Sequence, residues 1–385
     1  MKREVVRPNC ALVMAIAMFF SFTLLSGFIG KTAEAKDSSN KDAILIGYVS
    51  AFSGPLSQFT QSIKFMEKKA LGVINKDGGI YIEEYGKKVP VKVIYADSQS
   101  SSVKAMEDAT KLVLSNKVDF LVGAWTPDHI NPVSAAAERN RVPALMENGP
   151  MASWLTGGPY KWAFGNLFSF NKMVDAYIDA WDSVETNKKV GFIYDSNVDG
   201  VLLSKLTREK GEARGYTIVD PGRFPIGTKD YSTIISQFKK ADVDVVVANM
   251  ITPDFAVCWK QFHQQGFIPK IFTIGKGAHF TSDVKALGGD LGNGLLSEDL
   301  WEPAFPFTSS LTGQSAAELT KEFEETTGKH GDCTIGYDMS TFEVINDVFT
   351  RARSVDREKV RKALSETNMD GIYGHIEYNK QNIAE

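Results

Sequence analysis

Apolar residues along this chain alternate between two patterns. Short continuous runs, of which 44–49 is the first, predict buried strands, and longer stretches with an apolar residue every three or four positions predict amphipathic helices. Further strands are predicted at 91–95, 120–122 and 144–146, with helices at 63–74, 103–114 and 132–139. Strands separated by helices of this length indicate right-handed crossovers, so we expect a parallel sheet.

A second series of runs follows a turn-rich, aromatic region at 154–170. Strands are predicted at 190–194, 216–219, 243–247 and 271–274, again with helical patterns between them. The fold class is therefore α/β, with two doubly wound Rossmann-like lobes and a cleft where their strand ends face each other.

The last part of the chain has helical patterns but few strand-like runs. Pro303 and Pro306 interrupt the aromatic stretch at 301–307, which excludes a regular helix or a central strand there. Helices are predicted at 315–327, 335–353 and 356–367. We expect this tail to pack back onto an existing sheet.

The first 35 residues have the composition of a secretory signal peptide. Three basic residues precede an apolar segment at 11–29, and Ala33 and Ala35 follow with the small-residue spacing of a cleavage site. We expect export and cleavage after Ala35. The alternative is an uncleaved membrane anchor, because the apolar segment approaches the roughly 20 residues that span a bilayer.

Composition supports two globular lobes and gives no support to nucleic-acid binding. The chain has 385 residues, 43% of them hydrophobic, and a formal net charge of −4 spread without basic blocks beyond the N-terminus. Cys258 and Cys333 do not make a disulfide framework. Whether they pair stays open, although Cys258 lies in a helical pattern with apolar neighbours, which favours free thiols.

No catalytic or metal-binding motif emerges from the sequence. HExxH, GxSxG, CxxC and a strand-following GxGxxG are all absent, and no two histidines stand four residues apart. We therefore expect no enzyme activity, no metal and no cofactor. Asp128 and His129 are adjacent and make a poor acid/base pair. We expect Asp128 to be a helix-start charge and His129 a surface residue.

Polar and aromatic residues stand just beyond the predicted strands of both lobes. In open α/β sheets ligands bind there, because loops and helix N-termini converge at the carboxyl ends of the strands. The candidates are Phe52, Ser53, Trp125, Thr126, Glu147, Asn148, Asp199, Asn249 and Lys276. Each alone fits a loop or capping role equally well, but their recurrence in both lobes favours a ligand site.

Three segments resemble one protein family. They are "ILIGYVSAFSGPLSQFTQSIKFMEKKALGVINKDGGI", "VIYADSQSSSVKAMEDATKLVLSNKVDFLVGAW" and "KDYSTIISQFKKADVDVVVANM". In this order they are similar to the solute-binding proteins of branched-chain amino acid ABC transporters, which have the type I periplasmic-binding fold. The resemblance covers 44–378.

The resemblance implies three crossings between the lobes, near 165, 297 and 371. The expected boundaries are a signal peptide at 1–35, first lobe at 43–165, second lobe at 166–297, return to the first lobe at 298–371 and return to the second at 372–385. The chain ends at Glu385, sooner than the resemblance leads us to expect after "GHIEYN". The alternative that the last strand of the second lobe is missing stays open.

The resemblance also implies a ligand held between the lobes, its carboxylate in the first and its α-ammonium on an acid of the second. Where the resemblance implies a run of serines, this sequence has a single hydroxyl residue, Thr126. Lys276 stands where the acid is expected. A cation there repels an ammonium group, so we expect Lys276 to bind an anion instead. The alternative is that the alignment slips and Lys276 is a loop residue.

The expected solute is small, organic and carboxylate-bearing, with an apolar or aromatic body. We expect Phe59, Trp125 and Trp301 to stack on that body, while Glu147 offers a cation site in the first lobe. The resemblance implies a monomeric periplasmic protein that delivers its solute to an ABC permease and ATPase. The alternatives are branched-chain amino acid or amide binding, and a sensory receptor.

Overall fold

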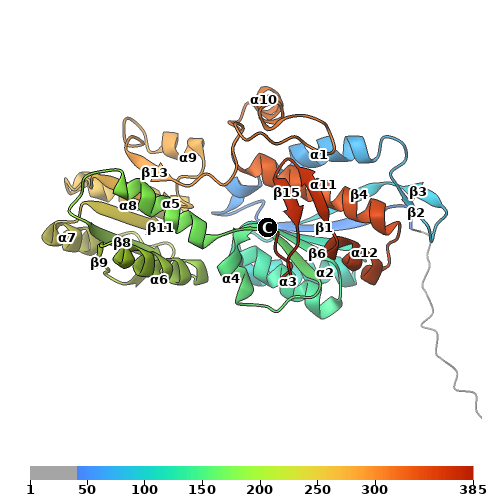
Figure 1. Cartoon of the computed structure of the whole chain (residues 1–385), viewed down its shortest axis with the longest axis horizontal. Coiled ribbons are helices and arrows are strands. Elements are labelled where there is room, and N and C mark those ends of the chain that lie inside the picture. The colour runs from blue at the N-terminus through green and yellow to red at the C-terminus, as the bar shows by residue number, and fades with distance from the viewer. Residues whose placement is uncertain (1–40, 385) are drawn as a thin grey trace, which may run out of the picture. The chain divides into compact units, whose positions relative to one another are not determined.

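The computed structural model describes residues 41–384, so the predicted signal peptide and its cleavage site lie outside the described residues. Two separate parallel sheets organise this part of the chain (Figure 1). We call the part built on the first sheet the first lobe and the part built on the other the second lobe. The α/β class and the parallel sheets predicted from the sequence are confirmed.

The first lobe has a five-stranded sheet in the order β4-β1-β5-β6-β7, with every neighbouring pair parallel. Its strands are β1 (Ile44–Ser50), β4 (Val91–Asp97), β5 (Phe120–Ala124), β6 (Ala144–Pro150) and β7 (Ala163–Phe168). Its helices are η1 (Ser57–Thr60), α1 (Ile63–Ile74), α2 (Ser102–Leu114), α3 (Pro127–Asn140) and α4 (Met151–Leu155). A short hairpin, β2 (Ile80–Ile82) and β3 (Lys87–Val89), precedes β4.

The second lobe has a sheet in the order β10-β8-β11-β12-β13, and β9 also pairs with β8. Its strands are β8 (Lys189–Asp195), β9 (Thr217–Val219), β10 (Arg223–Phe224), β11 (Val245–Asn249), β12 (Ile271–Gly275) and β13 (Leu295–Ser297). Its helices are α5 (Phe170–Asp182), α6 (Val198–Ala213), α7 (Ser232–Ala241), α8 (Thr252–Gln264) and α9 (Thr281–Ala286).

The tail of the chain packs on the first sheet. It contains α10 (Ala316–Thr327), α11 (Thr334–Ala352), α12 (Arg357–Ser365) and the hairpin β14 (Asn368–Gly371) and β15 (Gly374–Glu377). A capping box between Ser315 and Glu318 fixes the start of α10. α11 is buried along most of its length, and its Phe349 ring lies 6.0 Å from that of Phe120 in β5. The tail therefore completes the core of the first lobe.

The segment at 372–385, expected in the second lobe, stays with the first over its described residues. Ile372 and Ile376 are buried in the same hydrophobic cluster as α11, and Ile383 pairs with Gly165 of β7. The physical reason is the turn at Gly374, whose φ of 102° lets β15 fold back on β14 as a hairpin.

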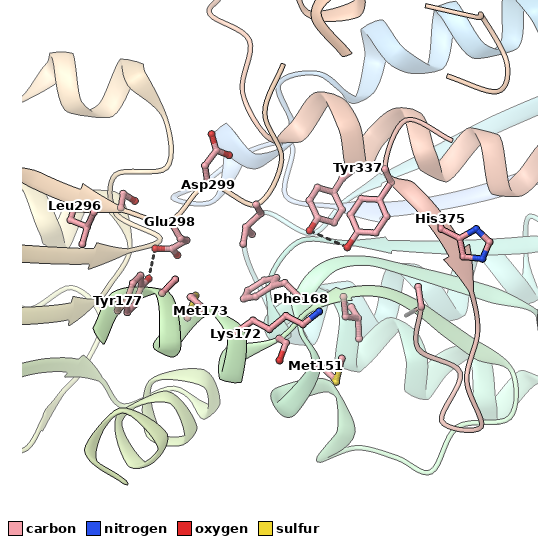
Figure 2. Close-up of a pocket in the computed structure, with 17 residues that line it drawn as sticks. Met151, Phe168, Lys172, Met173, Tyr177, Leu296, Glu298, Asp299, Tyr337 and His375 are labelled. Atoms are coloured by element: carbon pink, nitrogen blue, oxygen red, sulfur yellow. Dashed lines mark hydrogen bonds between the residues drawn. The ribbon is translucent and has the colours of Figure 1, made fainter. Parts of the chain in front are cut away.

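Two segments carry the chain between the sheets, and Figure 2 looks at this region. Residues 168–170 link β7 to α5, and residues 298–301 follow β13 toward the tail. β7 falls in the region predicted to be turn-rich. Gly165 and Asn166 break its apolar run, so the sequence pattern did not indicate a strand.

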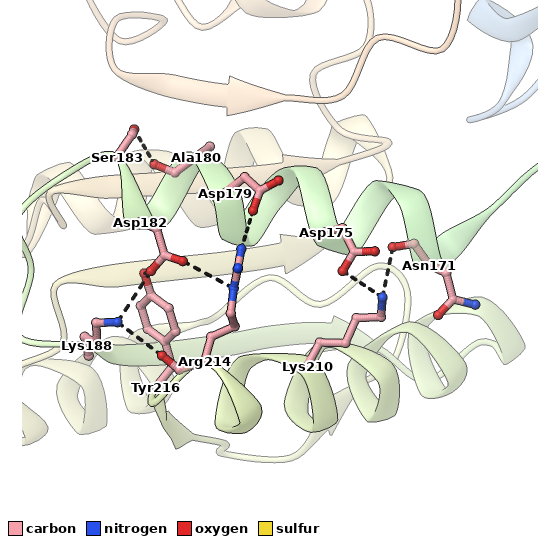
Figure 3. A network of polar contacts seen from close by, with 10 residues as sticks. All are labelled: Asn171, Asp175, Asp179, Ala180, Asp182, Ser183, Lys188, Lys210, Arg214 and Tyr216. Atoms are coloured by element: carbon pink, nitrogen blue, oxygen red, sulfur yellow. Dashed lines mark hydrogen bonds and ion pairs between the residues drawn. The ribbon is translucent and has the colours of Figure 1, made fainter.

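Ion pairs on the outside of the second lobe join α5 to α6 (Figure 3). Lys210 contacts Asp175 at 2.7 Å, and Arg214 reaches both Asp179 and Asp182. Because these side chains are partly exposed, each pair contributes at most about 1 kcal/mol. The network braces two helices of one lobe and has no member in the cavity described below.

Two further features bear on the sequence predictions. Cys258 and Cys333 are buried free thiols in separate hydrophobic clusters. Between residues 41 and 384, no helix combines the length and apolarity that a membrane span requires.

Candidate functional site

A small cavity lies where the strand ends of both lobes meet. Its volume is about 30 Å³, enough for one or two water molecules. Seven of the residues predicted from the sequence line it, namely Phe59, Trp125, Thr126, Asn148, Asp199, Asn249 and Lys276. The structure therefore brings residues from both lobes, far apart in the sequence, to one place.

The backbone is in the left-handed region at four of these positions. The φ angles are 62° at Trp125, 61° at Thr126, 46° at Asn148 and 64° at Lys276. Thr126 also has ψ of 152°, a combination that glycine alone adopts readily and that costs about 1–3 kcal/mol. Strain of this kind concentrates at functional sites, so its location here supports a role for the cavity.

Aromatic rings form one wall of the cavity and also connect the two lobes. The Phe59 ring lies 5.2 Å from Trp125 in its own lobe and 5.0 Å from Phe280 in the second lobe. Phe168, Phe170, Met173 and Leu300 extend the apolar lining. This wall suits an apolar or aromatic body.

Lys276 is not an unpaired cation. Its Nζ contacts Asp199 and lies 3.5 Å from Asp195, and the carboxylate of Asp128 in the first lobe also acts on it. Burial lowers the pKa of Lys276, but Asp199 and Asp195 raise it, and the balance leaves it above its ordinary value. Burial raises the pKa of Asp195 and Asp128. Three carboxyl groups thus surround one ammonium group.

Two buried amides at the cavity lack hydrogen-bond partners. Neither amide atom of Asn148 in β6 has a partner among the described residues, nor does the Nδ2 of Asn249 in β11. The two residues are 2% and 3% exposed. An unpaired buried polar group costs about 1–3 kcal/mol, so such groups are expected to have a partner. These amides can therefore form hydrogen bonds with a ligand, one from each lobe.

Three polar side chains in contact complete the site: Tyr177 and His279 of the second lobe and Glu298 of the segment that follows β13. Glu298 accepts from the Tyr177 hydroxyl, and its Oε1 lies 3.3 Å from Nε2 of His279. His279 and Glu298 both line the cavity, whereas sequence reasoning named neither. Glu298, Phe168 and Leu300 lie in or beside the segments between the sheets, where no strand-end pattern marks them.

Three of the predicted strand-end residues do not line the cavity. Ser53 is exposed and donates to Asp97 at 2.7 Å, and the Phe52 ring packs on Tyr95. Glu147 is fully buried and accepts from the Tyr48 hydroxyl. Because successive side chains of a strand point to opposite faces, Glu147 faces away from the cavity that Asn148 lines.

The expectation that Trp301 stacks on the solute is wrong. Its ring is buried in the first lobe, against Gly336 of α11, and its Nε1 donates to the Ile372 carbonyl at 2.8 Å. The aromatic residues around Trp301 in the sequence suggested a ligand-binding wall, but its side chain is part of the hydrophobic core of the first lobe.

The two residues at the start of α3 have different outcomes. Asp128 lies in the first helical turn, as predicted. His129, predicted at the surface, is buried, with Nε2 2.7 Å from Ser98 Oγ and Nδ1 2.9 Å from the Trp125 carbonyl. Burial lowers the pKa of His129. It supports the strained backbone at Trp125, a role that its polar sequence neighbours concealed.

A larger groove of about 880 Å³ lies behind the cavity, beside the segments between the sheets (Figure 2). Tyr337 and Tyr373 face each other there with their hydroxyl oxygens 3.4 Å apart. Of the predicted residues in the described chain, none lines this groove. Four side chains border both spaces: Phe168, Met173, Glu298 and Leu300.

Within residues 41–384, no group of three His, Cys, Asp or Glu side chains is arranged to hold a metal ion. The charged residues at the cavity pair with one another instead, as Lys276 does with Asp199 and His279 with Glu298.

Comparison with known proteins gives consistent results. A family model described as periplasmic binding protein matches residues 43–383. A relative from Brucella melitensis, a Leu/Ile/Val-binding protein homologue, is 26% identical over 255 residues, which are 66% of this chain and 66% of the relative, slightly under two thirds of its length. A leucine-binding protein from Thermotoga maritima superposes with a TM-score of 0.75 at 20% identity, covering 89% of this chain and 93% of that one. A solute-binding protein from R. palustris, solved with 4-hydroxybenzoate, gives a TM-score of 0.72 at 18% identity and coverage of 89% and 90%.

Proposed function

The chain belongs to the periplasmic binding protein family, and on that premise we propose that it captures a small organic carboxylate for an ABC transporter. The solute has an apolar or aromatic body and is held between the two lobes, which must lie farther apart than here to admit it, because the present cavity holds only one or two water molecules. Proteins of this family bind and release their solutes without chemical change. We propose 43–165 and 298–384 as the first lobe and 166–297 as the second.

One observation carries the proposal: each lobe contributes a buried, unpaired amide to the same cavity. Asn148 and Asn249 come from different sheets and line one cavity, so a single molecule between the lobes can bond to both. A solute that bonds to both is bound more tightly when the lobes are together than when they are apart. Its binding therefore shifts an equilibrium between open and closed forms toward the closed form.

The carboxylate of the solute belongs at the first lobe. Thr126 precedes α3, a helix of 14 residues whose N-terminus attracts negative charge, and Asn148 lies at the same cavity. Lys276 is a weaker candidate for the carboxylate, because Asp199 already compensates its charge. The apolar body then lies along Phe59 and Trp125.

The setting proposed for this binding is the periplasm. Export by the segment at 1–35, with cleavage after Ala35, delivers a monomer to the far side of the inner membrane. A permease and its ATPase then receive the solute from the closed form. This part rests on the family and on the sequence pattern of the first 35 residues.

A thermal-shift screen of amino acids, aliphatic carboxylates and aromatic carboxylates tests the proposal. A solute at 100 times its dissociation constant adds about 2.7 kcal/mol to the unfolding free energy. Asn148→Ala and Asn249→Ala should each weaken binding at least tenfold by calorimetry, while Asn116→Ala, at an exposed position of the first lobe, should leave it unchanged. Failure of every carboxylate to bind, or equal affinity in all three variants, overturns the proposal.

The second candidate is an α-amino acid. Lys276 is outnumbered by the carboxyl groups of Asp128, Asp195 and Asp199, so the second lobe tolerates an ammonium group that an unpaired lysine repels. Leucine and 4-methylpentanoate differ only in the amine and separate the two candidates. If leucine is preferred, Asp199→Asn should weaken leucine and strengthen 4-methylpentanoate.

A further inference from the structure

His279 combines deep burial with an open hydrogen-bonding position. Its side chain is 6% exposed, and Nε2 faces the Glu298 carboxylate at 3.3 Å. Its other ring nitrogen, Nδ1, has no partner among the described residues. The imidazole lines the cavity, with the Phe59 ring 5.9 Å away across the lobes.

Glu298 fixes which ring nitrogen carries the hydrogen. A carboxylate only accepts hydrogen bonds, so the nitrogen that faces it is the N–H. A neutral imidazole has a single N–H, which leaves Nδ1 with a lone pair. Tyr177 and the Lys276 backbone N–H also donate to Glu298, so the carboxylate is held in place for this task.

We propose that His279 is a specificity-determining residue, whose Nδ1 accepts a hydrogen bond from an O–H or N–H group of the solute. The solute therefore carries a hydrogen-bond donor where it faces the second lobe. A hydroxyl group and an ammonium group both supply this chemistry. The inference rests on the proposed function and narrows its solute class.

The surroundings favour a donor at this end of the cavity. Asp199 and Asp195 contact Lys276 in the second lobe, and their carboxyl oxygens attract a hydrogen-bond donor. A solute whose far end is purely apolar leaves Nδ1 buried and unpaired. Sites built to bond to a solute hydroxyl or amine reject analogues that lack it for this reason.

Paired probes that differ by one donor test the inference in the unaltered protein. 4-Hydroxybenzoate is compared with benzoate, and leucine with 4-methylpentanoate, by titration calorimetry. We expect the donor-bearing member of at least one pair to bind about two- to thirteenfold more tightly, the range of one net hydrogen bond. The pair that responds distinguishes a hydroxyl from an ammonium group.

Two variants separate a contact with the solute from a structural role. His279→Asn keeps a polar atom near the position of Nδ1 and loses the one that faces Glu298, whereas His279→Gln does the reverse. We expect H279N to keep the preference for the donor and H279Q to lose it. If His279 only supports Glu298 and does not contact the solute, H279Q keeps the donor preference and H279N loses it.

The outcomes distinguish failure of the inference from failure of the proposed function. If the carboxylates bind but no donor is preferred, or if H279Q keeps the preference, the role of His279 is overturned and solute capture stands. If none of the four probes nor any other carboxylate binds, both are overturned.

Discussion

Phe280 offers a way to weaken lobe closure without touching the solute. Its side chain is 1% exposed, and its ring meets that of Phe59 at 5.0 Å with an interplanar angle of 75°. Unlike Phe59, it does not line the cavity. Phe280→Ala therefore removes a contact between the lobes and leaves the solute's surroundings intact.

The size of the effect follows from what the ring loses when the lobes separate. Burial of a phenylalanine side chain is worth about 1.5–3 kcal/mol, and an edge-to-face pair adds about 0.5–1.5 kcal/mol. Closure should therefore weaken by up to about 2–4 kcal/mol. Because a tenfold change in affinity corresponds to about 1.4 kcal/mol, the dissociation constant should rise by up to roughly 30- to 700-fold.

Titration calorimetry measures the affinity, and small-angle scattering measures whether the ligand-free protein expands. Phe65→Ala is the matched control, because Phe65 makes a similar ring pair with Phe323 at 5.4 Å and 85° entirely within the first lobe. It should lower the unfolding free energy and leave affinity unchanged. Equal affinity in wild type and F280A refutes the argument, as does equal weakening in both variants.

Three further predictions concern buried groups. Asp199→Asn should cost about 2–3 kcal/mol of unfolding free energy, less than the 3–5 kcal/mol for a lone buried pair, because Lys276 keeps a second carboxylate. Glu147→Gln should be at least as stable as wild type at pH 8, because burial raises the pKa of Glu147 and the amide mimics its protonated form. Gly336→Ala should destabilise by about 1–3 kcal/mol, since its Cβ would lie 2.4 Å from the buried Trp301 ring.

Each of these has a control or a contrary outcome. The folded state binds the Glu147 proton more tightly than the unfolded state, so wild-type stability should fall as pH rises above about 4.3, and E147Q should lack this component. If the unfolding free energies of wild type and E147Q change in parallel with pH, this prediction is wrong. Gly72→Ala in α1, where nothing lies within 4 Å, should instead stabilise by up to about 1 kcal/mol. Chemical denaturation measures the unfolding free energy of both glycine variants. If D199N is as stable as wild type, the ion pair between Lys276 and Asp199 does not contribute to stability.

The sequence was sufficient for most of the fold. Apolar runs such as 44–49 and 120–122 became β1 and β5, because strands buried on both faces leave a continuous signal. β7 was missed because Gly165 and Asn166 interrupt it. The hairpin of β14 and β15 was also missed, since its strands are four residues long and β14 buries only Gly371.

The candidate site was predictable where it follows a strand and obscure elsewhere. Trp125 and Asn249 stand just beyond the strands predicted at 120–122 and 243–247, and the topology of a parallel sheet brings such positions together. Glu298 and Leu300 follow no recognisable strand signal. The sequence did not show that the charge of Lys276 is paired. Its partner Asp199 stands 77 positions earlier, and only the fold brings the two side chains together.

The four side chains that border both the cavity and the groove form a partition one residue thick. Phe168, Met173, Glu298 and Leu300 present one side to each space, and they belong to the segments that join the lobes or to the helix that follows one of them. A molecule bound in the groove would contact the same four side chains as the proposed solute. Because the cavity and the groove share these side chains, a molecule bound in the groove is expected to change the affinity for the solute without entering the cavity.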